Sequence, residues 1–165
     1  VMLEFANHND IESIREYLKS LVDSDNEVCG EVRHCDNLTI NTVLTVYERR
    51  ARESGISVKI SAKASQDLEV SPQDLVIVIA NLFENAIHAT KKNKNNKVID
   101  IIIKGNAQRL LIKVENPCKN NLTFDETLYG VGIHSVIATT NKYEGMYDFI
   151  AEDGIFSAKI SLNLK

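Results

Sequence analysis

The sequence lacks an apolar run long enough to span a membrane, and no signal peptide opens it. It has only three cysteines, Cys29, Cys35 and Cys118, and this odd, irregularly spaced set favours reduced thiols over a disulfide framework. Cys29, His34 and Cys35 lie close together, but no second pair of ligands follows at the spacing of a zinc site, which argues against a metal cluster. We therefore expect a cytoplasmic compartment.

An excess of positive charge is also missing. The net charge is −4, so the composition gives no reason to expect a general affinity for nucleic acid. The chain has 165 residues, 44% hydrophobic and 25% charged, which is enough for one globular domain with a small appendage. Because it starts with Val1 followed by Met2, we expect it to be cut from a longer protein.

The most informative segment is LVIVIANLFENAIHA, residues 75–89, which is apolar on nearly every side and predicts a helix buried between layers. Its polar side chains are three, four and seven residues apart and therefore share one helical face: Asn81, Glu84, Asn85 and His88. Buried amides and charges need partners, so the stripe implies either an internal hydrogen-bond network or a ligand. Amide and carboxylate oxygens suit a hard cation, and N–H donors suit phosphate, so we expect a hydrated metal–phosphate ligand.

Hydrophobic periodicity predicts the remaining elements. Helices are expected over residues 9–24, 38–54, 71–90 and 133–141, and strands over 56–62, 98–104, 109–115, 146–151 and 155–164. Asn116-Pro117 is expected to break the third strand, and a loop follows to residue 129. Because strands cluster in hairpins, we predict an α+β fold. It is a two-layer α/β sandwich with a mostly antiparallel mixed sheet, helices on one face and an additional N-terminal helix.

Three motifs, in this order, resemble those of the GHKL (Bergerat-type) ATP-binding domain. Residues 81–86 resemble its N box, residues 114–116 stand where its Asp box lies, and residues 130–132 resemble its second glycine box. The superfamily includes sensor histidine kinases, type II topoisomerases and mismatch-repair ATPases. Within it, the Val-Glu-Asn-Pro run at 114–117 and the short loop before Gly130 most resemble histidine kinases related to quorum-sensing peptide receptors.

The resemblance implies that ATP and Mg²⁺ bind here. Asn85 would coordinate the metal, Asn81 would support it, and Asn116 would pair with the adenine amino group. Gly130 and Gly132 would let the triphosphate approach the start of the following helix.

Other positions in the same region keep two interpretations. His88 either donates to a phosphate or is a surface imidazole, and Lys91 and Lys92 are solvated charges that are also within reach of a phosphate. Ile87 and Ile133 either wall the adenine or belong to the core.

The resemblance further implies a transferase. Asn81 stands where clamp ATPases carry a glutamate that deprotonates water, and an amide cannot act as that base. Glu84 remains a candidate for handling a proton. We therefore predict the catalytic domain of a two-component sensor histidine kinase, which transfers the γ-phosphoryl of Mg-ATP to a histidine upstream of this fragment. The alternative is a catalytically dead nucleotide-binding or interaction module, which the acidic Asp125 and Glu126 favour.

The expected domains are 1–34, part of a dimerisation region, and 35–165, the catalytic domain. His8 is interpreted as a polar turn residue, because it stands at the start of a helix that resembles the second dimerisation helix. The partners implied are the upstream phosphoacceptor histidine, a response regulator receiver domain and, in the full-length protein, a second copy; no nucleic acid is implied. The place implied is the cytoplasmic side of a membrane-bound bacterial sensor.

Overall fold

A computed structural model of the chain describes residues 33–119 and 130–165. The elements in this part are α3 (Leu38–Glu53), β1 (Ser57–Lys63), α4 (Pro72–Lys91), β2 (Val98–Gly105), β3 (Arg109–Pro117), α5 (Val131–Lys142), β4 (Met146–Glu152) and β5 (Ile155–Asn163). The predicted helix over 9–24, His8, Cys29, the acidic pair Asp125 and Glu126, and most of domain 1–34 lie outside the described residues.

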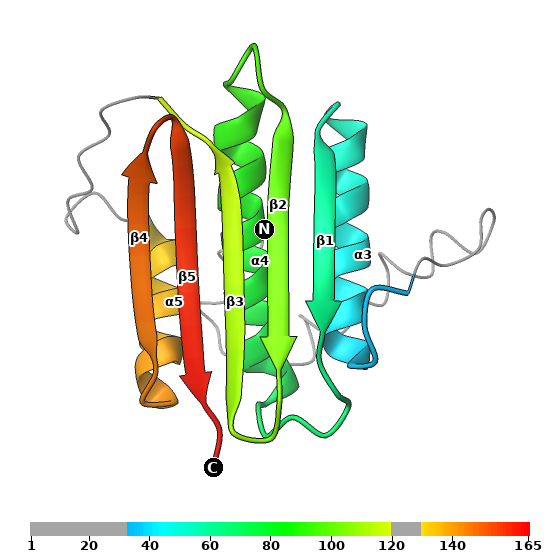
Figure 1. Cartoon of the computed structure of the whole chain (residues 1–165), viewed down its shortest axis with the longest axis vertical. Coiled ribbons are helices and arrows are strands. Elements are labelled where there is room, and N and C mark those ends of the chain that lie inside the picture. Colours follow the sequence, from blue (N-terminus) through cyan, green and yellow to red (C-terminus); the bar gives the residue numbers. More distant parts are fainter. Residues whose placement is uncertain (1–32, 120–129) are drawn as a thin grey trace.

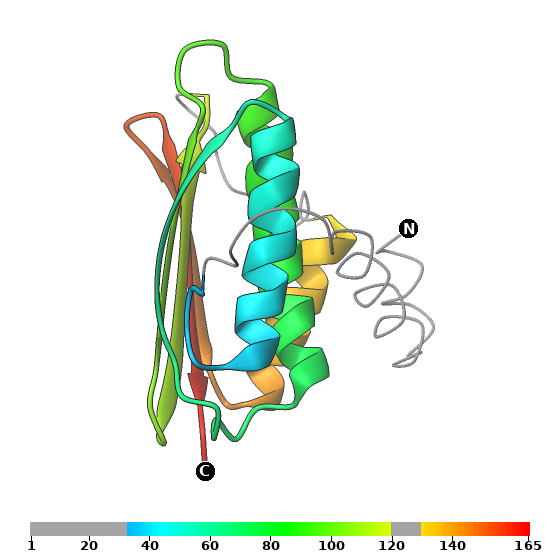
Figure 2. The ribbon, with the colours of Figure 1, turned by 90° about the vertical axis from the view of Figure 1, so that its right-hand side faces the viewer.

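The five strands form one sheet in the order β1-β2-β3-β5-β4, and the three helices lie side by side on one of its faces (Figures 1 and 2). Only the β1–β2 pair is parallel, and the other three pairs are antiparallel. This confirms the predicted two-layer α/β sandwich with a mostly antiparallel mixed sheet. Within residues 33–119 and 130–165, no helix combines the length and the apolar character that a membrane crossing needs.

Alternation along the central strands explains why the helices cover a single face. Every second side chain of β2 and β3 is buried beneath them: Ile99, Ile101, Ile103, Leu110, Ile112 and Val114. The residues between these point to the opposite face and are half polar and half apolar.

The central helix, α4, begins as the sequence predicts. Ser71 is its N-cap, with a side-chain oxygen that accepts a hydrogen bond from the backbone N–H of Asp74 at 3.2 Å, and Pro72 takes the first helical position. Phe83, buried on α4, stacks against Tyr47 of α3 with ring centroids 5.6 Å apart. The cap and the stacking therefore fix where α4 starts and how it packs on α3.

The prediction that Asn116-Pro117 breaks β3 is wrong. β3 continues through Pro117, with Asn116 opposite Phe156 and Pro117 opposite Ile155 of β5. Proline is tolerated at the end of a strand because few ladder hydrogen bonds are still required of it there. β2 pairs with β3 only as far as Glu115, so beyond Glu115 the backbone of β3 forms ladder hydrogen bonds with β5 alone. The N–H of Cys118 then continues that side by donating to the carbonyl of Gly154 at 2.8 Å.

Candidate functional site

Two amide side chains and an imidazole share one face of α4. Asn81 and Asn85 are half-buried and His88 is exposed, while Leu82, Phe83 and Ala86, on the other faces, are buried. The spacing of four and three residues therefore gives the polar face that the sequence predicts on an otherwise apolar helix.

Asn81 is fixed between α4 and α5. Its amide nitrogen donates to the carbonyl of Ile77 at 2.7 Å, which orients the side chain. Its Oδ1 then lies against Gly132, and a Cβ at position 132 would come within 2.8 Å of that oxygen. Gly132 is therefore needed for a close approach of α5 to the polar face of α4. Gly130 is different, because a Cβ there would meet no atom within 4 Å among the described residues.

The N-terminus of α5 thus meets the polar face of α4. Gly130 is the N-cap of α5 and provides no side chain to cap it, and its carbonyl accepts from the N–H of Ile133 at 3.0 Å. The first N–H groups of a helix carry partial positive charge and attract anions. A phosphate at this end of α5 would have backbone donors on one side and the amides of α4 on the other.

Asn116 comes from the sheet below the helices. It alternates in register with the buried Val114 and Ile112, so its side chain points to the helix-covered face, and it is 3% exposed. Its Nδ2 donates to the carbonyl of Pro117 at 3.0 Å, which leaves its Oδ1 as an acceptor. Such a buried acceptor suits a ligand that carries an amino group.

Glu84 points to a different neighbour. Its Oε2 lies 3.4 Å from Nη1 of Arg50 on α3, and Arg50 lies over the ring of Tyr47, 5.1 Å from its centroid. The structure therefore directs Glu84 toward α3, whereas Asn81 faces α5, and the proposed proton-handling role of Glu84 stays a prediction. The contact between Arg50 and Glu84 was not predicted from the sequence because it joins residues 34 positions apart.

The remaining predicted positions are at the edge of the site or in the core. Lys91 and Lys92 are exposed at the C-terminal end of α4. Ile87 and Ile133 are buried in the core cluster, at 4% and 8% exposure.

Of the residues Cys29, His34 and Cys35, the structure describes the last two. His34 lies 3.0 Å from Glu48 through its Nε2, the thiol of Cys35 donates to the carbonyl of Asn37 at 3.5 Å, and no group of three metal ligands occurs in residues 33–119 and 130–165. Burial raises the pKa of the Cys35 thiol, which makes it a poor ligand and nucleophile.

A cluster that the sequence did not reveal joins the start of α4 to the end of α5. Oδ2 of Asp74 accepts hydrogen bonds at 2.7 Å from Nζ of Lys142, from the hydroxyl of Tyr143 and from the hydroxyl of Ser71. Tyr143 Oη also accepts from the N–H of Ser71 at 3.1 Å. We call these four residues the clasp. The sequence could not reveal the clasp because Lys142 and Tyr143 lie 68 and 69 residues from Asp74.

Charge and burial compete at the clasp. Burial alone raises the pKa of the Asp74 carboxyl, but the hydrogen bonds from Lys142, Tyr143 and Ser71 outweigh it and hold that pKa below its ordinary value. The hydrogen bond to Asp74 raises the pKa of Lys142. The carboxylate is therefore ionised at neutral pH and fixes α4 and α5 in antiparallel alignment, which aligns Asn81 with Gly132.

Solved structures of histidine kinases share this fold. The histidine kinase AdeS of Acinetobacter baumannii has a TM-score of 0.58 at 17% identity, over 94% of this chain and 77% of its own. The nucleotide-free catalytic domain of histidine kinase ThkA has a TM-score of 0.59 at 17% identity, over 76% of this chain and 91% of its own. The histidine kinase domain of the blue-light activated EL346 from Erythrobacter litoralis has a TM-score of 0.59 at 11% identity, over 94% of this chain and 75% of its own.

At these identities the structures establish the fold, and sequence has to establish the family. No curated protein matches the chain in sequence. A family model described as the GHKL domain, however, matches residues 70–163, which run from the residue before the N-cap of α4 to the end of β5 and contain all three motifs. With more than half of its length matched and the fold of histidine kinase catalytic domains, the chain belongs to the GHKL domain family.

Proposed function

We propose that residues 35–165 bind Mg-ATP and transfer its γ-phosphoryl group to a histidine of a two-component sensor kinase. The observation that supports this best is the contact between Asn81 and Gly132, which joins the polar face of α4 to the N-terminal turn of α5. Oxygens that would ligate a metal and backbone N–H groups that would hold phosphate then lie close together. Phosphoryl transfer requires mainly positioning and charge neutralisation, and these groups can supply both.

The chemistry of the donor set fits the nucleotide and the metal. Mg²⁺ prefers oxygen ligands, and Asn85 offers an amide oxygen one turn beyond Asn81. In the proposal, Asn85 would hold the ion, which would neutralise charge on the phosphates, and Asn81 would support the ion or its water. The N–H groups at the start of α5 hold phosphate oxygens, and Oδ1 of Asn116 accepts from the adenine amino group. His88, exposed on the same face, would donate to a phosphate.

Transfer is favoured over hydrolysis by the same residues. Neither Asn81 nor Asn85 can take a proton from water, and Glu84, the carboxylate in the motif, is paired with Arg50 on the side of α3. The resemblance to histidine kinases supports a histidine in a dimerisation segment as the proposed acceptor. It also supports a receiver domain as the next recipient and a second copy as the partner in a membrane-bound sensor. An inactive module that only binds nucleotide is the alternative.

Asn85→Ala tests the metal ligand. We expect the variant to keep its fold and to lose the Mg²⁺-dependent part of ATP binding, by tenfold or more, which corresponds to at least about 1.4 kcal/mol. Asn96→Ala is the matched control, because Asn96 is an exposed amide in the loop after α4. The measurement is titration calorimetry with ATP, with and without Mg²⁺. Equal Mg-ATP binding by wild type and the Asn85 variant would remove Asn85 from the site.

A further inference from the structure

In the part of the chain that the structure describes, one face of the sheet carries no helix, and its charge distribution is uneven. We call it the outer face, and the described helices all lie on the other side of the five strands (Figure 2). Near the end where β1 and β2 finish and β3 begins, at the bottom of Figure 1, its charged residues are almost all basic. Alternation and register place five there: Lys63, Lys104, Arg109, Lys113 and Lys159. The acidic side chain in the same rows is Asp148, on the edge strand β4. We call this half of the outer face the basic half.

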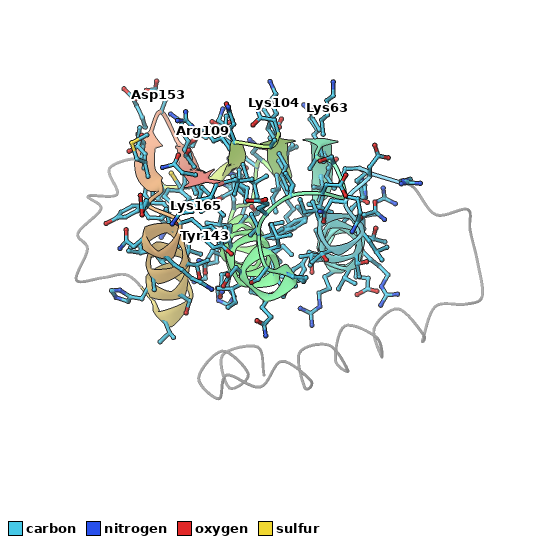
Figure 3. All side chains as sticks on the ribbon, turned by 90° about the horizontal axis from the view of Figure 1, so that it is seen from below. Lys63, Lys104, Arg109, Tyr143, Asp153 and Lys165 are labelled. Atoms are coloured by element: carbon cyan, nitrogen blue, oxygen red, sulfur yellow. The ribbon has the colours of Figure 1, made fainter. Side chains whose placement is uncertain are left out.

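Like charges stand directly beside each other in the basic half. Lys63 of β1 is the register partner of Lys104 of β2, and Lys113 of β3 is the register partner of Lys159 of β5. Lys63 and Lys104 are exposed, and Figure 3 shows both extending away from the helices. Lys113 is partly neutralised by Glu115, 2.8 Å away. Lys159 is also the register partner of Asp148, so Lys63 and Lys104 are the like-charged pair whose row contains no carboxylate. Like charges opposite each other destabilise a sheet, so this pair in a chain of net charge −4 indicates a surface suited to an anionic partner.

Exposed apolar side chains continue the same row of the sheet. Leu111 is the register partner of Lys104 and is 44% exposed, and Met146, across Ser161 in the same row, is 65% exposed. Along this row, the basic half therefore presents lysines on β1 and β2 and apolar side chains on β3 and β4. A partner that meets this surface gains from both charge and apolar burial.

We propose that the basic half is a docking surface for an anionic phospholipid bilayer. Four of its five cations are lysines, which are depleted at protein–protein interfaces, whereas arginine is preferred for carboxylates of proteins. Negatively charged headgroups attract lysines by net charge, and nearby apolar side chains enter the interfacial region. Nucleic acid is disfavoured because the aromatic side chains of this sheet region, Tyr147, Phe149 and Phe156, point to the opposite face of the sheet, so the basic half itself offers no ring on which a base could stack. The proposal does not depend on nucleotide binding.

The test is co-sedimentation of the 165-residue chain with vesicles. We expect binding to phosphatidylcholine vesicles that contain phosphatidylglycerol, little binding to phosphatidylcholine alone, and a decrease with salt. The double variant Lys63→Gln/Lys104→Gln should bind more weakly, by about fivefold for each lysine removed. Lys94→Gln/Lys97→Gln is the matched control, because it removes the same charge from exposed residues in the loop after α4, at the opposite end of the molecule.

Each other outcome overturns the proposal. No binding to the anionic vesicles, or equal binding by both double variants, would remove the basic half from membrane contact. A third outcome is that wild type binds immobilised polyglutamate but no vesicles, and that Lys63→Gln/Lys104→Gln binds neither. That result would assign the surface to an acidic protein. Both double variants should unfold at wild-type temperature or above, because the first relieves repulsion and the second changes an exposed loop, so loss of fold would not explain loss of binding.

Discussion

At the scale of single residues, the two glycines of the second glycine motif have different roles. Gly132 adjoins Oδ1 of Asn81, and Gly130 has open space around the position of a Cβ. Neither has a positive φ, so close approach, and not backbone freedom, is the reason for glycine at 132. The sequence gives both glycines the same role because both belong to the motif, and only the structure shows that their surroundings differ.

Gly132→Ala should therefore conflict with the Asn81 amide, which its hydrogen bond to Ile77 holds in place. We expect Gly132→Ala to destabilise the chain in the wild-type background. In an Asn81→Ala background it should be neutral or stabilising, because alanine is a better helix former than glycine. The predicted coupling energy is about 1 kcal/mol. Urea unfolding of the two single variants and the double variant measures it.

Gly130→Ala is the control and should give no coupling with Asn81→Ala. Additive effects of Gly132→Ala and Asn81→Ala would show that the two side chains do not share space in solution, and the geometry proposed for the site would then be wrong.

At the scale of elements, most of the boundaries expected from the sequence agree with the structure, and local signals explain why. Ser71-Pro72 starts α4, Gly55, with φ of 70°, follows α3, and Asp153-Gly154, both with positive φ, turn the last hairpin. These signals depend on capping and turn geometry within a few residues, which a sequence displays directly. The clasp and the extension of β3 through Pro117 were missed because they depend on partners that lie far away in the sequence.

The clasp predicts how stability responds to acid. Because its hydrogen bonds hold the folded-state pKa of Asp74 below the unfolded value, the ionised carboxylate contributes stability above about pH 4, and this is lost as the pH falls through the folded-state pKa. Asp74→Asn should therefore lower stability at neutral pH and flatten its fall below about pH 4. Urea unfolding across a series of pH values measures both effects.

Asp67→Asn is the matched control, because Asp67 is an exposed carboxylate in the loop before α4. It should keep the wild-type acid profile. If Asp74→Asn keeps that profile too, other carboxylates control acid unfolding, and the clasp does not hold α4 to α5 through an ionised Asp74.

At the scale of the whole molecule, the arrangement of layers was predictable. The clustering of strands in hairpins and the alternation of apolar and polar residues are visible in the sequence, and they determine which strands pair and which face of the sheet is buried. The site was predictable in part: the N box gave Asn81 and Asn85 as one face, but the approach of α5 to that face and the separation of Glu84 toward α3 depend on helix packing. The basic half of the outer face could not be predicted, because its lysines come from β1, β2, β3 and β5 and become neighbours only through strand order and register.

The function of the whole molecule gives the last prediction. No histidine of this sequence stands in an acceptor box, so the isolated chain, incubated with radiolabelled Mg-ATP, should gain no acid-labile phosphate on His8, His34, His88 or His134. When a segment with the acceptor histidine is supplied as a separate chain, we expect that segment to become labelled. Asn85→Ala should abolish this labelling and Asn96→Ala should keep it.

Mg-ATP binding without transfer to any supplied segment would instead support the inactive module, and label on a histidine of the isolated chain would place the acceptor within these 165 residues. Release of free phosphate from ATP at a rate that exceeds transfer would contradict the argument that the amides of α4 cannot activate water.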